Sequence, residues 1–90
     1  MASDADADER QQALSEKMYR HKRFRVTHGR DAPETLDAAN ALVAELLAIG
    51  RPYAAYGLAE KTLRRSKRVL GDDHPDTLAC ERNVSASRED

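Results

Sequence analysis

The sequence lacks most of the features that mark disulfide-linked, secreted or membrane proteins. It has no tryptophan and a single cysteine in 90 residues, so an internal disulfide framework is excluded. No stretch approaches the roughly 20 apolar residues that span a bilayer, and the acidic start MASDADADER has no apolar signal-peptide core. We therefore expect a cytoplasmic protein without a membrane segment, in which Cys80 is a small buried residue.

Composition and charge favour a small helical domain. Charged residues make up 34% of a chain of 90 residues, so one domain with a modest core is expected. Alanine and leucine dominate the apolar residues, which favours an all-α fold. The net charge is −1, but acids crowd residues 4–9 and basic residues crowd 17–30 and 61–68. This balance does not favour general nucleic-acid affinity, although a local electropositive face is compatible with it.

One phrase occurs twice, 42 positions apart. HGRDAPETL at residues 28–36 returns as LGDDHPDTL at residues 70–78, and IGRPY at 49–53 repeats the order of its Gly and Pro. Glycine suits the position after a helix, where φ is positive, and proline suits the first turn of the next helix. The pattern predicts helix breaks near Gly29, Gly50 and Gly71.

Four antiparallel helices in a right-handed stack follow from these breaks, over about residues 8–27, 33–49, 52–70 and 75–86. We expect a flexible acidic N-terminus at 1–7, one helical domain at 8–86 and a polar tail at 87–90. The helix at 33–49 has a regular apolar stripe, and Leu42 and Leu46 are predicted to form the central core with Leu63. Leu36 and Leu78 are expected in equivalent buried positions.

The two flanking helices give weaker predictions. The apolar residues of the helix at 8–27 form a ragged stripe of Leu14, Met18, Tyr19, Phe24 and Val26. For the helix at 52–70, EKTLRRSKR is predicted to face water, and Gly57 to mark a close helix–helix contact. Its buried side is expected to comprise Tyr53, Tyr56, Ala59, Leu63 and Leu70.

The repeated corner resembles that of the tetratricopeptide repeat, in the 42-residue form typical of kinesin light chains. ANALVAEL at 39–46 and GRPYAAYGLAEKTL at 50–63 resemble the openings of the family's first and second helices. The likeness covers residues 27–86, with one complete repeat at 33–74. It implies a non-catalytic module that binds a protein or peptide in a groove lined by the helices at 33–49 and 75–86. The partner-binding candidates are Asn40, Arg82 and Asn83, although each asparagine could equally bond across helices.

Other functions have less support in the sequence. Neither a carboxylate pair, nor a Ser-His-Asp set, nor a phosphate-binding glycine loop is visible, so we expect no enzyme, no cofactor and no metal. Asp72, Asp73 and His74 are read as a helix-start corner, because no further ligand stands at a suitable spacing. The alternative function is a small nucleic-acid-binding regulator, which would use basic faces of the first and third helices: Lys22, Arg23, Arg25, Arg64, Arg65 and Arg68.

Self-association is also expected. Helical repeats bury their faces against neighbouring repeats, and about three units are normally needed. This chain offers one complete unit, a second-type helix before it and a first-type helix after it. The sequence therefore predicts a homo-oligomer, most simply a dimer.

Overall fold

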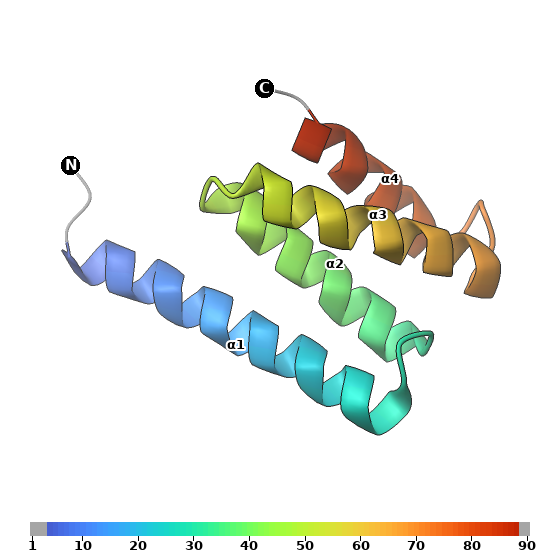
Figure 1. Cartoon of the computed structure of the whole chain (residues 1–90), viewed down its shortest axis with the longest axis horizontal. Helices are drawn as coiled ribbons and strands as arrows, with labels where there is room; N and C mark the ends of the chain where they lie inside the picture. Colours follow the sequence, from blue (N-terminus) through green and yellow to red (C-terminus); the bar gives the residue numbers. More distant parts are fainter. Residues whose placement is uncertain (1–3, 89–90) are drawn as a thin grey trace.

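A computed structural model describes residues 4–88, with side chains from residue 7 onward. Four helices and no strand lie in that range, and Figure 1 shows that successive helices run antiparallel. They are α1 (Asp4–His28), α2 (Pro33–Ala48), α3 (Pro52–Val69) and α4 (Pro75–Arg88). The predicted all-α fold is thus confirmed. None of the helices is both long and apolar enough to cross a membrane, within the described residues.

The corners follow the predicted chemistry. Gly29, Gly50 and Gly71 have φ of 88°, 79° and 96°, values that residues with a Cβ rarely adopt. A proline opens each of the following helices, where its missing N–H leaves no hydrogen bond unmade. The α4 corner has an additional cap, because Nδ1 of His74 accepts a hydrogen bond from the backbone N–H of Asp76 at 3.0 Å.

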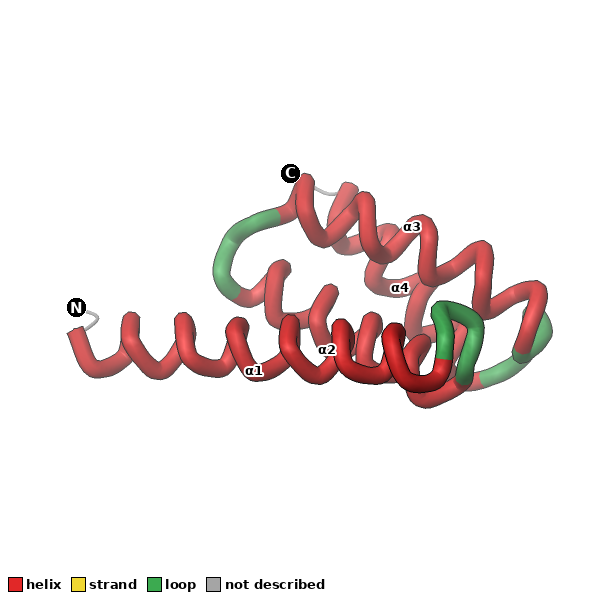
Figure 2. Tube along the Cα trace, turned by 60° about the horizontal axis from the view of Figure 1, so that its bottom comes forward, coloured by secondary structure: helices red, strands yellow, loops and turns green. Residues whose placement is uncertain are grey.

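The central helix is α2, which contacts each of the other three. Its residues Leu42, Val43 and Leu46 form the core with Leu14 of α1 and with small residues of α3, Ala55 and Ala59. Burial of the predicted α2 stripe is confirmed, apart from the half-buried Leu47. By contrast, α1 contacts α2 alone among the other helices, and its N-terminal part runs beyond the end of α2 (Figure 2).

The predicted buried face of α3 is wrong except at Ala59, which is fully buried. Tyr53 is 94% exposed, and Leu63 lies outside the buried core, half-exposed. The buried residues are small and recur every three or four positions: Ala55, Ala59, Thr62 and Ser66. Two of these lie in the stretch EKTLRRSKR that was expected to face water. Small side chains let α3 pack with its backbone close to its neighbours, and the larger residues are left at the edges.

Three further predictions about packing are also wrong. A Cβ at Gly57 would meet no atom within 4 Å, so this glycine marks no close helix contact. Leu78 is 41% exposed, whereas Leu36 is 1% exposed. Of the ragged α1 stripe only Leu14 is buried, and Met18, Tyr19 and Val26 are exposed.

The two end helices are longer than the sequence suggested. Helix α1 begins at Asp4, so part of the N-terminus expected to be flexible is helical, and residues 1–3 lie outside the described residues. Helix α4 continues to Arg88, and Ser87 in its last turn is buried. The Ser87 hydroxyl donates to the Asn83 carbonyl at 2.7 Å, which satisfies the hydroxyl inside this turn.

Candidate functional site

The Asn40 side chain is the centre of a polar network between α2 and α4. Its Oδ1 accepts from Sγ of Cys80 at 3.0 Å and from Nδ2 of Asn83 at 3.4 Å. Its Nδ2 donates to the carbonyl of Asp76 at 3.3 Å. The Cys80 sulfur also lies 3.5 Å from Oγ of Ser66 on α3. One side chain of α2 is thereby linked to α4 directly and to α3 through the buried thiol.

The three predicted partner-binding residues have different surroundings. Asn40 makes the bond across helices that the sequence left open as an alternative to ligand binding. Asn83 is half-buried, and its amide is directed to Asn40. Arg82 is exposed and lies on the outer side of α4, in a shallow hollow with Leu78, Glu81, Ser85 and Ala86. Arg82 therefore remains accessible to a partner, whereas Asn40 is engaged within the fold.

The outer side of α4 is more polar than the equivalent side of α2. Counting 42 positions along the chain, the α2 residues Ala39, Val43 and Leu46 correspond to Glu81, Ser85 and Arg88 of α4. The α2 residues are buried, and their α4 equivalents are exposed. A polar outer face is what terminal, capping helices of repeat proteins carry. Except at Leu78, α4 thus ends the stack without needing a further helix.

The predicted basic face divides into separate parts. Arg64 pairs with Glu60 at 3.4 Å. Arg68 pairs with the Asp31 carboxylate at 2.7 Å. Arg23 lines a surface hollow on α1 without another residue of the predicted set, and Lys22 shares a second hollow with Arg25. Arg25 also lines a cavity between α1, α2 and α3 together with Arg65.

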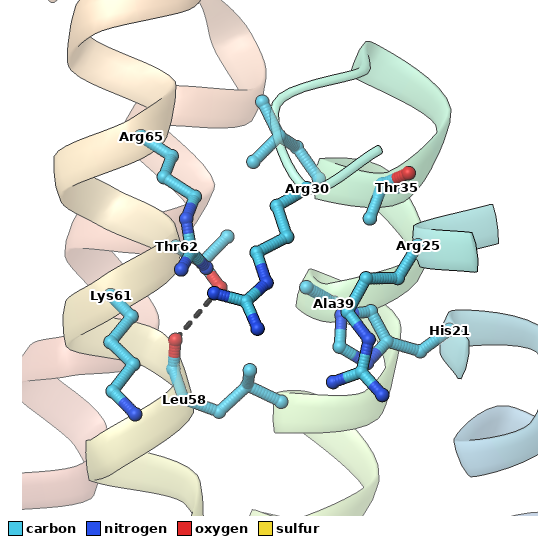
Figure 3. Close-up of a pocket in the computed structure, with 10 residues that line it drawn as sticks. His21, Arg25, Arg30, Thr35, Ala39, Leu58, Lys61, Thr62 and Arg65 are labelled. Atoms are coloured by element: carbon cyan, nitrogen blue, oxygen red, sulfur yellow. Dashed lines mark hydrogen bonds between the residues drawn. The ribbon is translucent and has the colours of Figure 1, made fainter. Parts of the chain in front are cut away.

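That cavity includes cations that the sequence analysis missed. Figure 3 shows Arg30 reaching from the α1–α2 corner between the helices, with Lys61 and Arg65 on one side and His21 and Arg25 on the other. The available signal was spacing, since His21 and Arg25, and likewise Lys61 and Arg65, stand four apart on one helix face. Burial, together with the positive charges of Arg25 and Arg65, lowers the pKa of His21 below its ordinary value.

The repeated corner, the paired helices and the spacing of the copies together point to one family. The model of the tetratricopeptide repeat family matches residues 35–76. Over this segment the chain is similar to a tetratricopeptide repeat. The match nearly coincides with the complete unit predicted at 33–74, and it does not distinguish the kinesin-light-chain form. Repeats of this family are typically non-catalytic modules that bind proteins. Comparisons with curated proteins and with solved structures each give no match.

Proposed function

We propose that this tetratricopeptide-repeat chain is a non-catalytic, cytoplasmic protein-interaction module that assembles with a second copy of itself through α1. The observation that carries the proposal is the exposure of large apolar side chains on this helix. Met18 is 53%, Tyr19 67% and Val26 72% exposed. Met18 and Tyr19 stand eight and seven residues before Val26, so all three lie along one side of the helix.

The packing of α1 supports this choice of surface. Helix α1 contacts only α2 among the other described helices. Aromatic residues and methionine are enriched at protein interfaces, and an apolar stripe on a small protein is a candidate contact surface. The opposite end of the repeat has the polar outer face of α4. The geometry therefore favours an assembly in which two α1 helices meet, over one in which α4 is covered.

The distribution of charge along α1 supports a second copy of the chain as the occupant. The N-terminal half of the helix contains Asp8, Glu9 and Glu16, and the C-terminal half contains Lys22, Arg23 and Arg25. An antiparallel, two-fold pairing of α1 with α1 places each acidic half beside a basic half of the other copy. A two-fold contact is also the commonest symmetry of homo-oligomers. The charge pattern thus complements the apolar stripe without requiring a second protein.

The test is the mass in solution of the full chain from micromolar to near-millimolar concentration, measured by sedimentation equilibrium. We expect a monomer–dimer equilibrium that Tyr19→Glu shifts to monomer. Tyr53→Glu is the matched control, because Tyr53 is 94% exposed on α3 and should leave the dimer intact. Charge screening should weaken the dimer as salt is raised. A monomer mass at all concentrations, or equal disruption by both variants, contradicts the proposal.

The second candidate contact surface is α4, where Asn83 bonds to Asn40 of α2 and the neighbouring Arg82 is exposed on the outer side. Amide shifts of the chain on dilution distinguish the two faces. Changes confined to residues around Met18 and Tyr19 support assembly through α1. Changes centred on Arg82 and Asn83 would instead assign the contact to this second face.

Nucleic-acid binding, the alternative drawn from sequence, has less support in the geometry. Arg64 and Arg68 are paired with acids, and the remaining predicted basic residues do not form one continuous face. Binding of a DNA or RNA duplex with a steep salt dependence would favour this alternative. We expect no such binding at physiological salt.

A further inference from the structure

The cavity between α1, α2 and α3 has a volume of about 150 Å³. A cavity of this size admits a guest as large as benzene. It has room for one tetrahedral oxyanion, while the remainder of a larger ligand would stay outside. Residues of α1, of the α1–α2 corner, of α2 and of α3 all contribute to its walls. Its shape therefore depends on the folded arrangement of three helices and not on one helix alone.

The charge around this cavity is of one sign. Arg25, Arg30, Lys61 and Arg65 line it, and no aspartate or glutamate is among the residues that do. Among the described ion pairs, one carboxylate contacts this group of cations. It is that of Asp31, which lies 3.9 Å from Nε of Arg65. The same carboxylate oxygen lies closer to Arg68, at 2.7 Å. Four cations from three segments thus surround a small space with little compensation by acids.

Thr35 lines the wall as well, and Figure 3 shows its hydroxyl directed away from the cations. Thr35, in the first turn of α2, is 2% exposed, and its hydroxyl has no hydrogen-bond partner among the described residues. The equivalent Thr77 of α4 has an unpartnered hydroxyl too, but no cluster of cations accompanies it. The first copy of the corner therefore differs from the second in its cluster of cations and not in its threonine.

We propose that this cavity is a binding site for a phosphate monoester group. A phosphate monoester carries nearly two negative charges at neutral pH and three strong acceptor oxygens. Arginine guanidinium groups donate to such oxygens in a fixed, two-pronged geometry, and lysine adds a point charge. The site is formed within one chain and does not require assembly through α1, although Arg25 belongs to both surfaces. The group can belong to a small phosphorylated metabolite or to a phosphorylated side chain of a protein.

An NMR titration of the full chain at constant ionic strength tests the site. The probes are inorganic phosphate, O-phosphoserine, and a short phosphoserine peptide beside its unphosphorylated form. We expect saturable shifts at the amides of Arg30, Thr35 and Leu36 with each phosphate probe and none with the unphosphorylated peptide. Tighter binding of the phosphopeptide than of O-phosphoserine assigns the group to a protein. Equal binding assigns it to a small molecule.

Matched variants separate this site from general attraction to a basic protein. Arg30→Gln should weaken phosphate binding about tenfold, since it removes charged hydrogen bonds. Arg51→Gln is its control, because Arg51 follows Gly50 just as Arg30 follows Gly29 and is exposed at the other end of the repeat. Lys61→Gln and Lys67→Gln form a second pair on α3. Equal effects within each pair, or no saturable shift, overturn the proposal.

The pKa of His21 provides a second measurement, because it should change only if the anion binds in the cavity. This histidine is surrounded by Arg25 on α1, Arg30 at the corner and Lys61 and Arg65 on α3, with uncharged Thr35, Leu36 and Ala39 on α2. A bound dianion offsets these positive charges, so phosphate should raise the pKa of His21. The same titration is repeated with Tyr19→Glu, which should be monomeric. A rise in the His21 pKa in this variant is then independent of assembly. An unchanged His21 pKa at saturation contradicts binding in the cavity.

Discussion

At the residue scale, the glycines show how local conformation determines the effect of one methyl group. Gly71 has a φ of 96°, whereas Gly57 lies within α3. An added Cβ would meet no atom within 4 Å at either position, so steric contact with other elements is absent from both. Any difference between the two alanine variants therefore reflects the backbone alone.

The two alanine substitutions should change the free energy of unfolding in opposite directions. Gly71→Ala should lower the free energy of unfolding by about 1–2 kcal/mol, the cost of holding an L-residue in the left-handed region. Gly57→Ala should raise it by about 0.5–1 kcal/mol, because alanine favours the helix interior. Urea denaturation of both variants beside the parent chain measures the difference. Changes of the same sign would contradict the assigned backbone conformations.

At the scale of helices, the repeat supplies two equivalent leucines in different surroundings. Leu36 and Leu78 each stand fourth in their helix, in α2 and α4, so intrinsic helix propensity affects both equally. Leu36 is 1% exposed and Leu78 is 41% exposed. The difference arises because α3 follows α2 and packs on it, while the outer side of α4 faces solvent.

Leu36→Ala should therefore cost about 2–5 kcal/mol, the range for truncating a buried leucine. Leu78→Ala should cost about 1 kcal/mol or less, because much of its apolar surface is already in water. Denaturant midpoints, read with the slope of each transition, give both values. Equal losses would indicate that Leu78 is covered in solution, by a second copy or by another segment.

The three breaks between helices could be predicted from sequence because their causes are local. A glycine with positive φ and a proline in the next first turn are visible in the chain itself, at all three corners. The face of α3 could not be predicted in this way. Of its buried residues Ala59 was predicted, but Ala55, Thr62 and Ser66 were not, because hydrophobicity favoured Tyr53 and Leu63.

In the candidate sites, too, some features could be predicted from the sequence and others depend on how the helices are placed. Asn40 was identified from the resemblance, but its bonds to Cys80 and Asn83 depend on how α2 and α4 are placed. The cavity proposed to bind phosphate is lined by residues that are spread along the sequence from His21 to Arg65 and come together only in the folded chain. Charge spacing on α1 and on α3 indicated two basic faces, but Arg30 joins them only because the corner turns its side chain between the helices.

At the scale of the whole molecule, stability is unevenly distributed. Helix α2 contacts all three other helices, and α1 contacts α2 alone within the described residues. Among described ion pairs, α1 is linked to α2 by Lys17 and Glu45 at 3.6 Å, an exposed contact of small energetic value. Local opening should therefore begin in α1, since opening free energies follow the number of buried contacts.

Amide hydrogen exchange at two protein concentrations tests this order and the proposed assembly together. In dilute solution we expect α1 to exchange fastest and α2 slowest. At high concentration a contact through α1 should slow exchange in α1 and leave α3 and α4 unchanged, because only surface covered by the second copy gains protection. Tyr19→Glu should keep α1 fast at both concentrations, and Tyr53→Glu should behave as the parent chain. If the mass doubles while α1 exchange stays the same, the two copies meet elsewhere, and the apolar stripe of Met18, Tyr19 and Val26 is not the contact.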